Sequence, residues 1–167
     1  RDRLRSRGLG DVYKRQRKAR EFALLGVYES LINESADFAA IDANLLSVIT
    51  DEGSPVAGCD LSSEDFDHCD QEFYRDILDG VIKGKGELLE TLSRHLDRDP
   101  QRLSVVERAC LMIGTWEMKN CPQIPYRVVI NEAVELCKVF GADRGYKLVN
   151  GVLDKVASEL RPAEHEA

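Results

Sequence analysis

The chain has 167 residues, of which 43% are hydrophobic and 32% charged, and its formal net charge at pH 7 is −7. This length predicts one domain that buries roughly two thirds of its unfolded surface. No apolar run approaches the ~20 residues of a membrane span, and no hydrophobic signal segment opens the chain. We therefore expect a soluble, cytoplasmic protein.

The first sixteen residues differ from the rest in composition. Residues 5–16 are rich in Gly and Arg, lack an apolar stripe and resemble translated adapter sequence. We exclude residues 1–16 from the fold prediction as a non-native or disordered segment, the alternative being a basic arm that binds nucleic acid. Without their six Lys/Arg and two Asp/Glu, 17 basic and 28 acidic residues remain, a formal charge of −11. Nucleic acid could then bind only at a local cationic site or together with a basic partner.

Apolar residues recur at helical spacing in the rest of the chain, and no segment alternates with period two. A first helix is predicted from about residue 17 to residue 31. A second is predicted by four apolar residues: Phe38, Ile41, Leu45 and Ile49. Gly and Pro within 51–60 predict a loop. One longer helix, which Ser62 or Ser63 can cap, is predicted by the next apolar set: Phe66, Cys69, Phe73, Ile77 and Val81.

The second half of the chain continues the helical pattern. A short leucine-rich helix is predicted to end before Pro100. Ser104 precedes Glu107 by three residues, a capping box in which each side chain bonds the backbone of the other residue, so a helix is predicted to start there.

Two further helices are predicted at the C-terminal end, 128–140 and 143–160, with Gly141 as the C-cap between them. The acidic tail, 162–167, is expected to fray. These segments predict an all-α domain of about seven helices over residues 17–161.

The cysteines and the sequence motifs predict neither metal binding nor catalysis. The five cysteines form no CxxC pair, and Cys110 and Cys137 fall on apolar helix faces, so reduced core thiols are expected. His68 and Cys69 have carboxylates nearby, but no second pair at ligand spacing accompanies them, so we predict neither a metal site nor a cofactor. The chain holds no phosphate-binding loop and no recognisable catalytic set, so no enzyme activity is predicted.

Residues 124–157 carry polar side chains that helix propensity does not explain. Asn150 and Gly151 lie inside a helical pattern although both are poor helix formers, Gly by about 1 kcal/mol relative to Ala. Asn131 and Glu132 also lie inside a helical pattern, one helix earlier, and Asn131 is again a poor helix former. This stretch closely resembles the C-terminal signature of the NusB family of bacterial transcription antitermination factors.

Three other stretches resemble the first, the central and the following helix of the family, in family order: RKARE at 17–21, FYRDILDGV at 73–81 and VERA at 106–109. The resemblance implies two packed three-helix subbundles plus a connecting helix. It also implies a function: together with the ribosomal protein NusE, the protein would bind boxA RNA and join an RNA polymerase antitermination complex, chiefly for ribosomal RNA transcription.

The first predicted helix begins with three cations. Arg17, Lys18 and Arg20 crowd its first turns, where the macrodipole disfavours positive charge by several tenths of a kcal/mol each. They are either a solvated helix end or, as the resemblance implies, contacts for RNA. Tyr28 has the spacing of a core residue, whereas the resemblance places the matching Tyr near the RNA face, so burial and base stacking both stay open.

The last predicted helix carries the other RNA candidates. Lys147 and Asn150 lie one turn apart on its polar side, where Lys can neutralise a phosphate and Asn can bond a base edge or cap a helix. Arg144 adds positive charge nearby. Leu148 stands where some relatives have an aromatic residue, which leaves base stacking there in doubt.

Two pairs of residues in these segments are expected to have structural roles. Asn131 and Glu132 should bond across helices, because buried polar side chains normally need partners. Gly80 and Gly151 should permit close contact between helices.

The resemblance also implies a protein interface. Glu107 would contact NusE in addition to capping its helix. Phe73, Tyr74, Arg75 and Asp76 resemble the rest of that interface, although the helical pattern alone makes Phe73 a core residue and Arg75 and Asp76 a solvated pair. An acidic body suits a basic ribosomal partner.

Two other functions stay open. One is a related RNA-binding domain found at the N-terminus of certain ribosomal RNA cytosine methyltransferases, which we disfavour because the sequence ends a few residues after its last predicted helix. The other is a structural dimer whose central face meets a second copy instead of a ribosomal protein.

Overall fold

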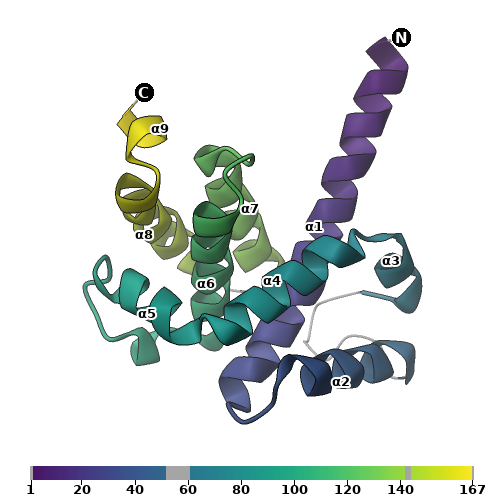
Figure 1. The fold of residues 1–167 in the computed structure, drawn as a ribbon, viewed down its shortest axis with the longest axis horizontal. Coiled ribbons are helices and arrows are strands. Elements are labelled where there is room, and N and C mark those ends of the chain that lie inside the picture. The colour runs from purple at the N-terminus through teal and green to yellow at the C-terminus, as the bar shows by residue number, and fades with distance from the viewer. Residues whose placement is uncertain (1, 52–60, 142–143, 167) are drawn as a thin grey trace.

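The computed structural model describes residues 2–51, 61–141 and 144–166, and these are helical without a strand in any of the three ranges (Figure 1). The elements in chain order are α1 (Asp2–Ile32), α2 (Phe38–Asp51), α3 (Ser63–His68), α4 (Gln71–Lys83), α5 (Lys85–Ser93), the 3₁₀ turn η1 (Pro100–Arg102), α6 (Val105–Asn120), α7 (Tyr126–Val139), α8 (Gly145–Leu160) and α9 (Pro162–Glu166). Seven of these described α-helices are nine residues or longer, which confirms the predicted all-α fold of about seven helices.

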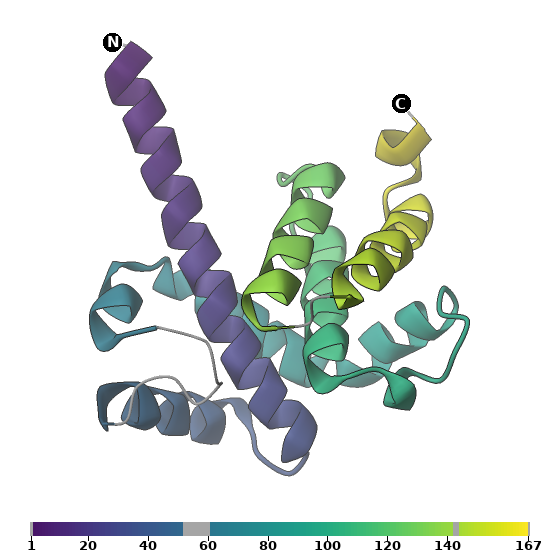
Figure 2. The same cartoon turned by 180° about the vertical axis from the view of Figure 1, so that it is seen from behind.

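The helices form two groups around α1 and α6. α1 packs against α2, α3 and α4, while α6 packs against α7 and α8 (Figures 1 and 2). α1 also contacts α6, which joins the groups, and α5 leads from α4 to the outer side of α6. This arrangement agrees with the predicted pair of subbundles and connecting helix.

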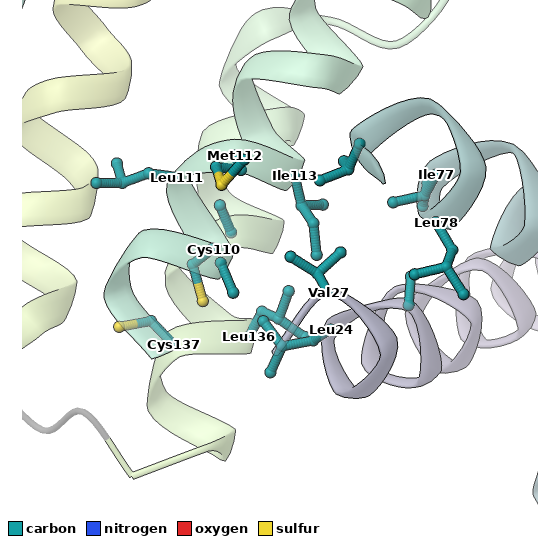
Figure 3. Packing of buried hydrophobic residues seen from close by; sticks show 14 of the residues in the cluster. Leu24, Val27, Ile77, Leu78, Cys110, Leu111, Met112, Ile113, Leu136 and Cys137 are labelled. Carbon is teal, nitrogen blue, oxygen red and sulfur yellow. The ribbon is translucent and has the colours of Figure 1, made fainter. Parts of the chain in front are cut away.

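The core lies where the two groups meet. Leu24 and Val27 of α1 face Leu78 of α4 and Ile113 of α6, and Leu136 of α7 closes the cluster (Figure 3). These side chains are no more than 3% exposed. Their burial removes apolar surface from water at about 25 cal/mol per Å², the main stabilising contribution to such a fold.

Helix α1 begins well before the predicted first helix. It runs unbroken from Asp2, and its N-terminal half projects beyond the body of the molecule (Figures 1 and 2). Arg15 ties this half to the body: its Nε donates to the backbone oxygen of His68 at 3.0 Å, and its own carbonyl accepts from the amide of Asp70 at 3.2 Å. The cations from Arg17 onward therefore lie in mid-helix, and the argument from the helix N-terminus does not apply to them.

The single helix predicted from Phe66 to Val81 is wrong, because the chain turns between α3 and α4. Cys69 is extended (φ −80°, ψ 168°) and buried, and Asp70 caps α4 by accepting the amide of Phe73 at 3.1 Å. Side chains such as Asp bond nearby backbone groups, which favours a cap over helix continuation. The helical spacing of the apolar residues continues across this turn, so it did not reveal the break.

Several boundaries match the predictions and one differs. α7 ends at Val139, and Gly141 two residues later has a φ of +88°, the left-handed conformation expected of the glycine that terminates a helix. The C-terminal tail forms α9 instead of fraying, because Glu164 accepts the amide of Tyr126 at 2.8 Å and a hydrogen bond from Arg161 at 2.7 Å. The predicted 51–60 loop beyond Asp51, with Cys59, and the predicted helix start at 143 lie outside the described residues.

Glycines mark the closest approaches between helices. A Cβ at Gly80 would overlap the indole of Trp116, and one at Gly114 would lie 2.7 Å from the Cδ1 of Leu153. The expected close contact at Gly80 is therefore confirmed. The same expectation is wrong for Gly151, where a Cβ would meet nothing within 4 Å. Packing gives no reason for this mid-helix glycine, which costs about 1 kcal/mol relative to Ala.

Candidate nucleic-acid interface

Arg20 lies in the interior, between α1, α4 and α6. Its side chain is 4% exposed and donates two hydrogen bonds to Glu117, at 2.8 and 3.1 Å. Its guanidinium carbon lies 5.1 Å from the ring centre of Phe73, a cation–π contact. Burial raises the pKa of the Glu117 carboxyl, and the charge of Arg20 opposes that rise. Arg20 therefore joins three helices and does not reach the surface on which a ligand would bind.

Arg17 and Lys18 are more accessible but also paired. Arg17 donates to both carboxylate oxygens of Glu132 on α7, at 3.1 and 3.0 Å, while its side chain stays 55% exposed. Lys18 lies 3.3 Å from the carboxylate of Glu21. Burial raises the pKa of Glu21, and Lys18 lowers it. Glu132 and Glu21 are only 15% and 9% exposed, so each pair has a largely buried carboxylate and a cation that reaches the surface.

The cluster on α1 is therefore balanced in charge. Three cations face three carboxylates, and Glu132 also lies 3.8 Å from Arg20. We expected a small cationic patch here from the sequence. The difference arises because Glu117 and Glu132 come from α6 and α7, and only the packing of those helices brings them to α1.

Among the predicted RNA residues that the structure describes, two unpaired cations lie at the start of α8. Arg144, Lys147 and Asn150 are all exposed, and neither cation forms an ion pair with any described residue. Beside them, the Nζ of Lys138 at the end of α7 lies 4.8 Å from the ring centre of Tyr146, a cation–π contact. This corner combines positive charge, an amide side chain and an aromatic ring.

The predicted RNA residues therefore form two sets that do not touch. α7 lies between α1 and α8 (Figure 2), and it packs on both. Tyr28, half-buried, lies eleven residues after Arg17, or about 16 Å along α1 at 1.5 Å per residue. A single strand that used both sets would have to cross the C-terminal end of α7, near Lys138.

The predicted protein-contact residues on α4 also divide. Tyr74 is fully buried, and its hydroxyl donates to Asp42 at 2.6 Å, which leaves it no surface for a partner. Phe73 and Asp76 line a surface groove of about 330 Å³ together with Trp116 of α6. Arg75 is exposed outside this groove.

Glu107 lies at the other end of α6. Its amide donates to the hydroxyl of Ser104 at 3.1 Å, which is the N-cap bond expected from the sequence. The Glu107 carboxylate accepts from this same hydroxyl at 2.9 Å and not from the Ser104 amide, so the second bond of the predicted capping box is wrong. Glu107 is nine residues from Trp116, about 13 Å along the helix, so it is separate from the groove.

Metal and membrane sites receive no support from the described ranges. There, no three His, Cys, Asp or Glu side chains gather closely enough to hold a metal ion. None of the helices in these ranges combines the length and the apolar composition needed to cross a bilayer.

Comparison with known proteins identifies the family. The model of the NusB family matches residues 17–158. The chain belongs to the NusB family. It is 44% identical over 152 residues to a transcription antitermination protein NusB of Burkholderia lata, covering 91% of this chain and 94% of that protein. A relative of the same name from Cupriavidus pinatubonensis is 42% identical over 149 residues, 89% of this chain and 80% of the relative.

A solved structure agrees with this family membership. NusB of T. maritima superposes with a TM-score of 0.69 at 25% sequence identity, covering 90% of this chain and 96% of that one. The family match begins at Arg17, the residue at which the predicted domain begins.

Sequence reasoning missed three residues that shape these surfaces. Glu117 follows Trp116 on a largely buried helix, and an acidic residue in an apolar stripe is the signal of a buried pair. Trp116 itself is half-buried at the edge of the groove. Tyr146 carried no signal in the sequence, because its cation–π contact depends on the turn between α7 and α8.

Proposed function

We propose that the protein is a transcription antitermination factor that binds boxA RNA together with NusE and joins an RNA polymerase complex, chiefly in ribosomal RNA transcription. It would act in the cytoplasm and catalyse no reaction. The observation that carries the proposal is the pair of unpaired cations, Arg144 and Lys147, beside Asn150 at the start of α8. Residues 17–167 carry a formal charge of −11, so phosphate affinity needs such a local site.

The contribution of α1 to RNA binding is narrower than its sequence suggests. Arg17 and Lys18 would meet phosphates from the solvent side, because their own side chains are 55% and 41% exposed whereas their partners Glu132 and Glu21 are only 15% and 9% exposed. Arg20 would hold α1 in place without touching RNA. Lys138, at the C-terminal end of α7, and Tyr146, near the start of α8, would contact the single-stranded RNA where it crosses from one set to the other.

The groove between α4 and α6 is the proposed contact for NusE. It presents the aromatic rings of Phe73 and Trp116 with the carboxylates of Asp76 and Asp79. Aromatic residues dominate the binding energy of many interfaces, and acidic groups attract a basic partner. Arg75 and Glu107 would lie at the rim of the interface.

Fluorescence anisotropy with labelled boxA RNA, with and without NusE, tests the RNA contact. Arg144→Ala with Lys147→Ala should weaken binding and reduce the slope of log K against log salt by about 1.4, since each phosphate contact on a single strand contributes about 0.7. Lys83→Ala is the matched control, because its side chain is 76% exposed on α4. Equal affinity of the double variant and the control would contradict the proposal.

Fluorine NMR tests the protein contact. Trp116 is the chain's single tryptophan, so 5-fluorotryptophan gives one signal, which should shift when NusE is added. Asp76→Lys should weaken the complex, whereas Tyr74→Phe should not. Light scattering should show a monomer that forms a heterodimer with NusE, and a stable homodimer would favour the structural alternative.

A further inference from the structure

Gly151 opens onto a groove between α8 and the segment that follows α5. The groove measures about 190 Å³, several times the volume of a water molecule. Leu148 and Val152 of α8 supply its apolar lining, and His95 lines it from the segment that follows α5. Since no side chain fills the space at Gly151, a ligand in the groove could lie directly against the backbone of α8.

Two lysines flank the glycine on the same face of α8. Lys147 lies four residues before Gly151 and Lys155 four residues after it, one helical turn in each direction. Both line the groove, and neither forms an ion pair within 4.0 Å among the described residues. Lys147 also belongs to the RNA surface proposed above, so the groove continues that surface along α8.

One carboxylate, Asp97, lines the groove, and its ion pair is with a neighbouring residue and not with the lysines. Asp97 pairs with Arg98 at 3.0 Å, and this hydrogen bond lowers its pKa, with a smaller contribution from Lys155. Asp154, next to Lys155 in sequence, bonds His165 at 3.1 Å.

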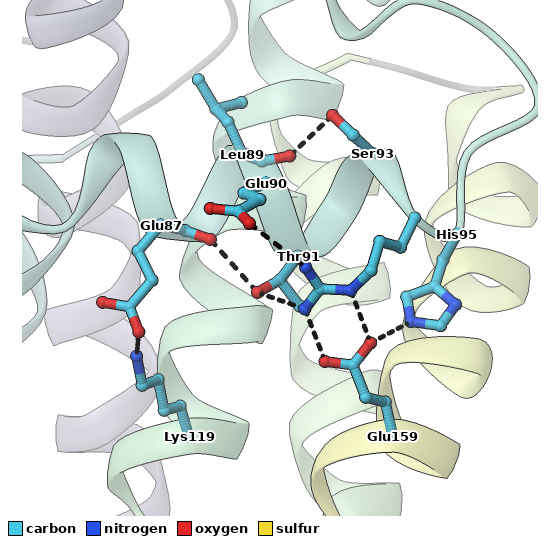
Figure 4. A network of polar contacts seen from close by, with 9 residues as sticks. Glu87, Leu89, Glu90, Thr91, Ser93, His95, Lys119 and Glu159 are labelled. Atoms are coloured by element: carbon cyan, nitrogen blue, oxygen red, sulfur yellow. Dashed lines mark hydrogen bonds and ion pairs between the residues drawn. The ribbon is translucent and has the colours of Figure 1, made fainter.

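Glu159, one turn beyond Lys155, is held by other residues. Its carboxylate accepts two hydrogen bonds from Arg94, at 3.0 and 2.7 Å, and lies 2.9 Å from the Nε2 of His95 (Figure 4). The hydrogen bond from Arg94, followed by that from His95, lowers the pKa of Glu159 to about 2. Its charge is thus satisfied within the fold, and among the residues that line the groove the two lysines outnumber the single carboxylate, Asp97.

We propose that this groove seats a nucleotide of the bound single-stranded RNA, with its phosphates at Lys147 and Lys155 and its base over Leu148 and Val152. The proposal rests on the proposed function. Gly151 is the specificity-determining position, because any side chain there would occupy the space of the nucleotide. An acidic protein segment would be attracted by the same lysines, but the continuity with Lys147 and Asn150 favours RNA.

Substitution of Gly151 tests the groove without endangering the fold. Gly151→Ala should raise the midpoint of thermal unfolding, since Gly is a poor helix former and nothing lies within 4 Å of the new Cβ. Gly151→Leu should not lower that midpoint, since Leu also favours the helix more than Gly does. Gly151→Leu should nevertheless weaken boxA RNA binding by about tenfold, the contribution of one nucleotide contact. Gly86→Leu is the matched control, because Gly86 is also helical with nothing within 4 Å and lies on α5.

Removal of the flanking charge gives a second, independent measurement. Lys155→Ala should reduce the slope of log K against log salt by about 0.7, the value for one phosphate contact on a single strand. Lys83→Ala should leave that slope unchanged.

The outcomes separate the groove from the overall function. If the wild-type chain binds boxA RNA but Gly151→Leu and Lys155→Ala bind it equally well, the groove does not hold RNA and the proposed function stands. If Gly151→Leu loses NusE binding while its RNA affinity is unchanged, the groove holds protein and the inference is overturned. If the wild-type chain fails to bind boxA RNA even with NusE, the proposed function fails, and the groove inference with it.

Discussion

Replacing Arg20 by alanine should lower the free energy of unfolding by roughly 3–5 kcal/mol, the range for removing one partner of a buried ion pair. The variant would leave Glu117, whose side chain is 2% exposed, without its two hydrogen bonds. It would also remove the cation–π contact with Phe73, which contributes about 0.5–2 kcal/mol. For a domain of this size, the midpoint of thermal unfolding should fall by about 6–20 °C. Far-UV circular dichroism during heating and urea titration measures both quantities.

The loss of stability caused by Arg20→Ala should also depend on pH. Burial raises the pKa of Glu117 in the folded protein, so the folded state binds a proton there more tightly than the unfolded chain does. The contribution of Glu117 to the free energy of unfolding is therefore most favourable below its pKa in the unfolded chain. This contribution declines as the pH rises through its pKa in the folded protein. Without Arg20, whose charge opposes the rise, the folded pKa moves higher. The penalty of Arg20→Ala should therefore be larger at about pH 8 than at about pH 5.

Two controls test this reasoning. Arg20→Met combined with Glu117→Leu removes both charges and should recover most of the loss, because hydrophobic replacement of a buried pair is often neutral or stabilising. Arg17→Ala removes a pair whose cation is 55% exposed, and Glu132 would keep Arg20 at 3.8 Å, so the loss of stability should be well below that of Arg20→Ala. If Arg20→Ala behaves like Arg17→Ala, then the Arg20 pair is accessible to water, and Arg20 returns as a candidate RNA contact.

Four further changes probe helix packing, capping and a buried hydrogen bond. Gly151→Ala should stabilise the fold by about 1 kcal/mol, whereas Gly80→Ala should destabilise it by about 1–3 kcal/mol because the Cβ would overlap the indole of Trp116. Ser104→Ala should cost about 1 kcal/mol by removing the N-cap bond of α6. Tyr74→Phe should cost about 1–3 kcal/mol through its lost hydroxyl bond, with NusE affinity unchanged. Urea denaturation measures the stabilities, and titration calorimetry measures the affinity.

Each of these results has a contrary outcome. A stabilising Gly80→Ala would show that α4 and α6 are not in close contact at that position. An unchanged stability of Ser104→Ala would mean that its hydroxyl does not cap α6 in solution. Weaker NusE binding by Tyr74→Phe would place this ring at the interface despite its burial.

The helices themselves could be predicted because their signals are local. Apolar spacing located α2 and α6, Ser104 located the start of α6, and Gly141 located the end of α7. The turn at Asp70 was missed because a short capped break leaves the apolar spacing on either side nearly in register with one longer helix.

The charged site could be predicted only in part. The sequence placed Arg17, Lys18 and Arg20 on one helix, but it held no information on which of them is exposed. Arg20 meets Glu117 across 97 residues of sequence, and Arg17 meets Glu132 across 115. Such pairs follow from the positions of three helices relative to one another, which periodicity within each helix does not determine.

Glycine illustrates the same division. Gly80 and Gly151 look alike in sequence, since each interrupts an amphipathic helix. In the structure, Trp116 fills the space beside Gly80, whereas the space beside Gly151 is open. The sequence by itself determined where the helices form and which face of each is apolar, because those properties depend on neighbours within a few turns. Only the tertiary structure decided which cations stay unpaired and which glycine faces a groove, because those properties depend on side chains brought from distant helices.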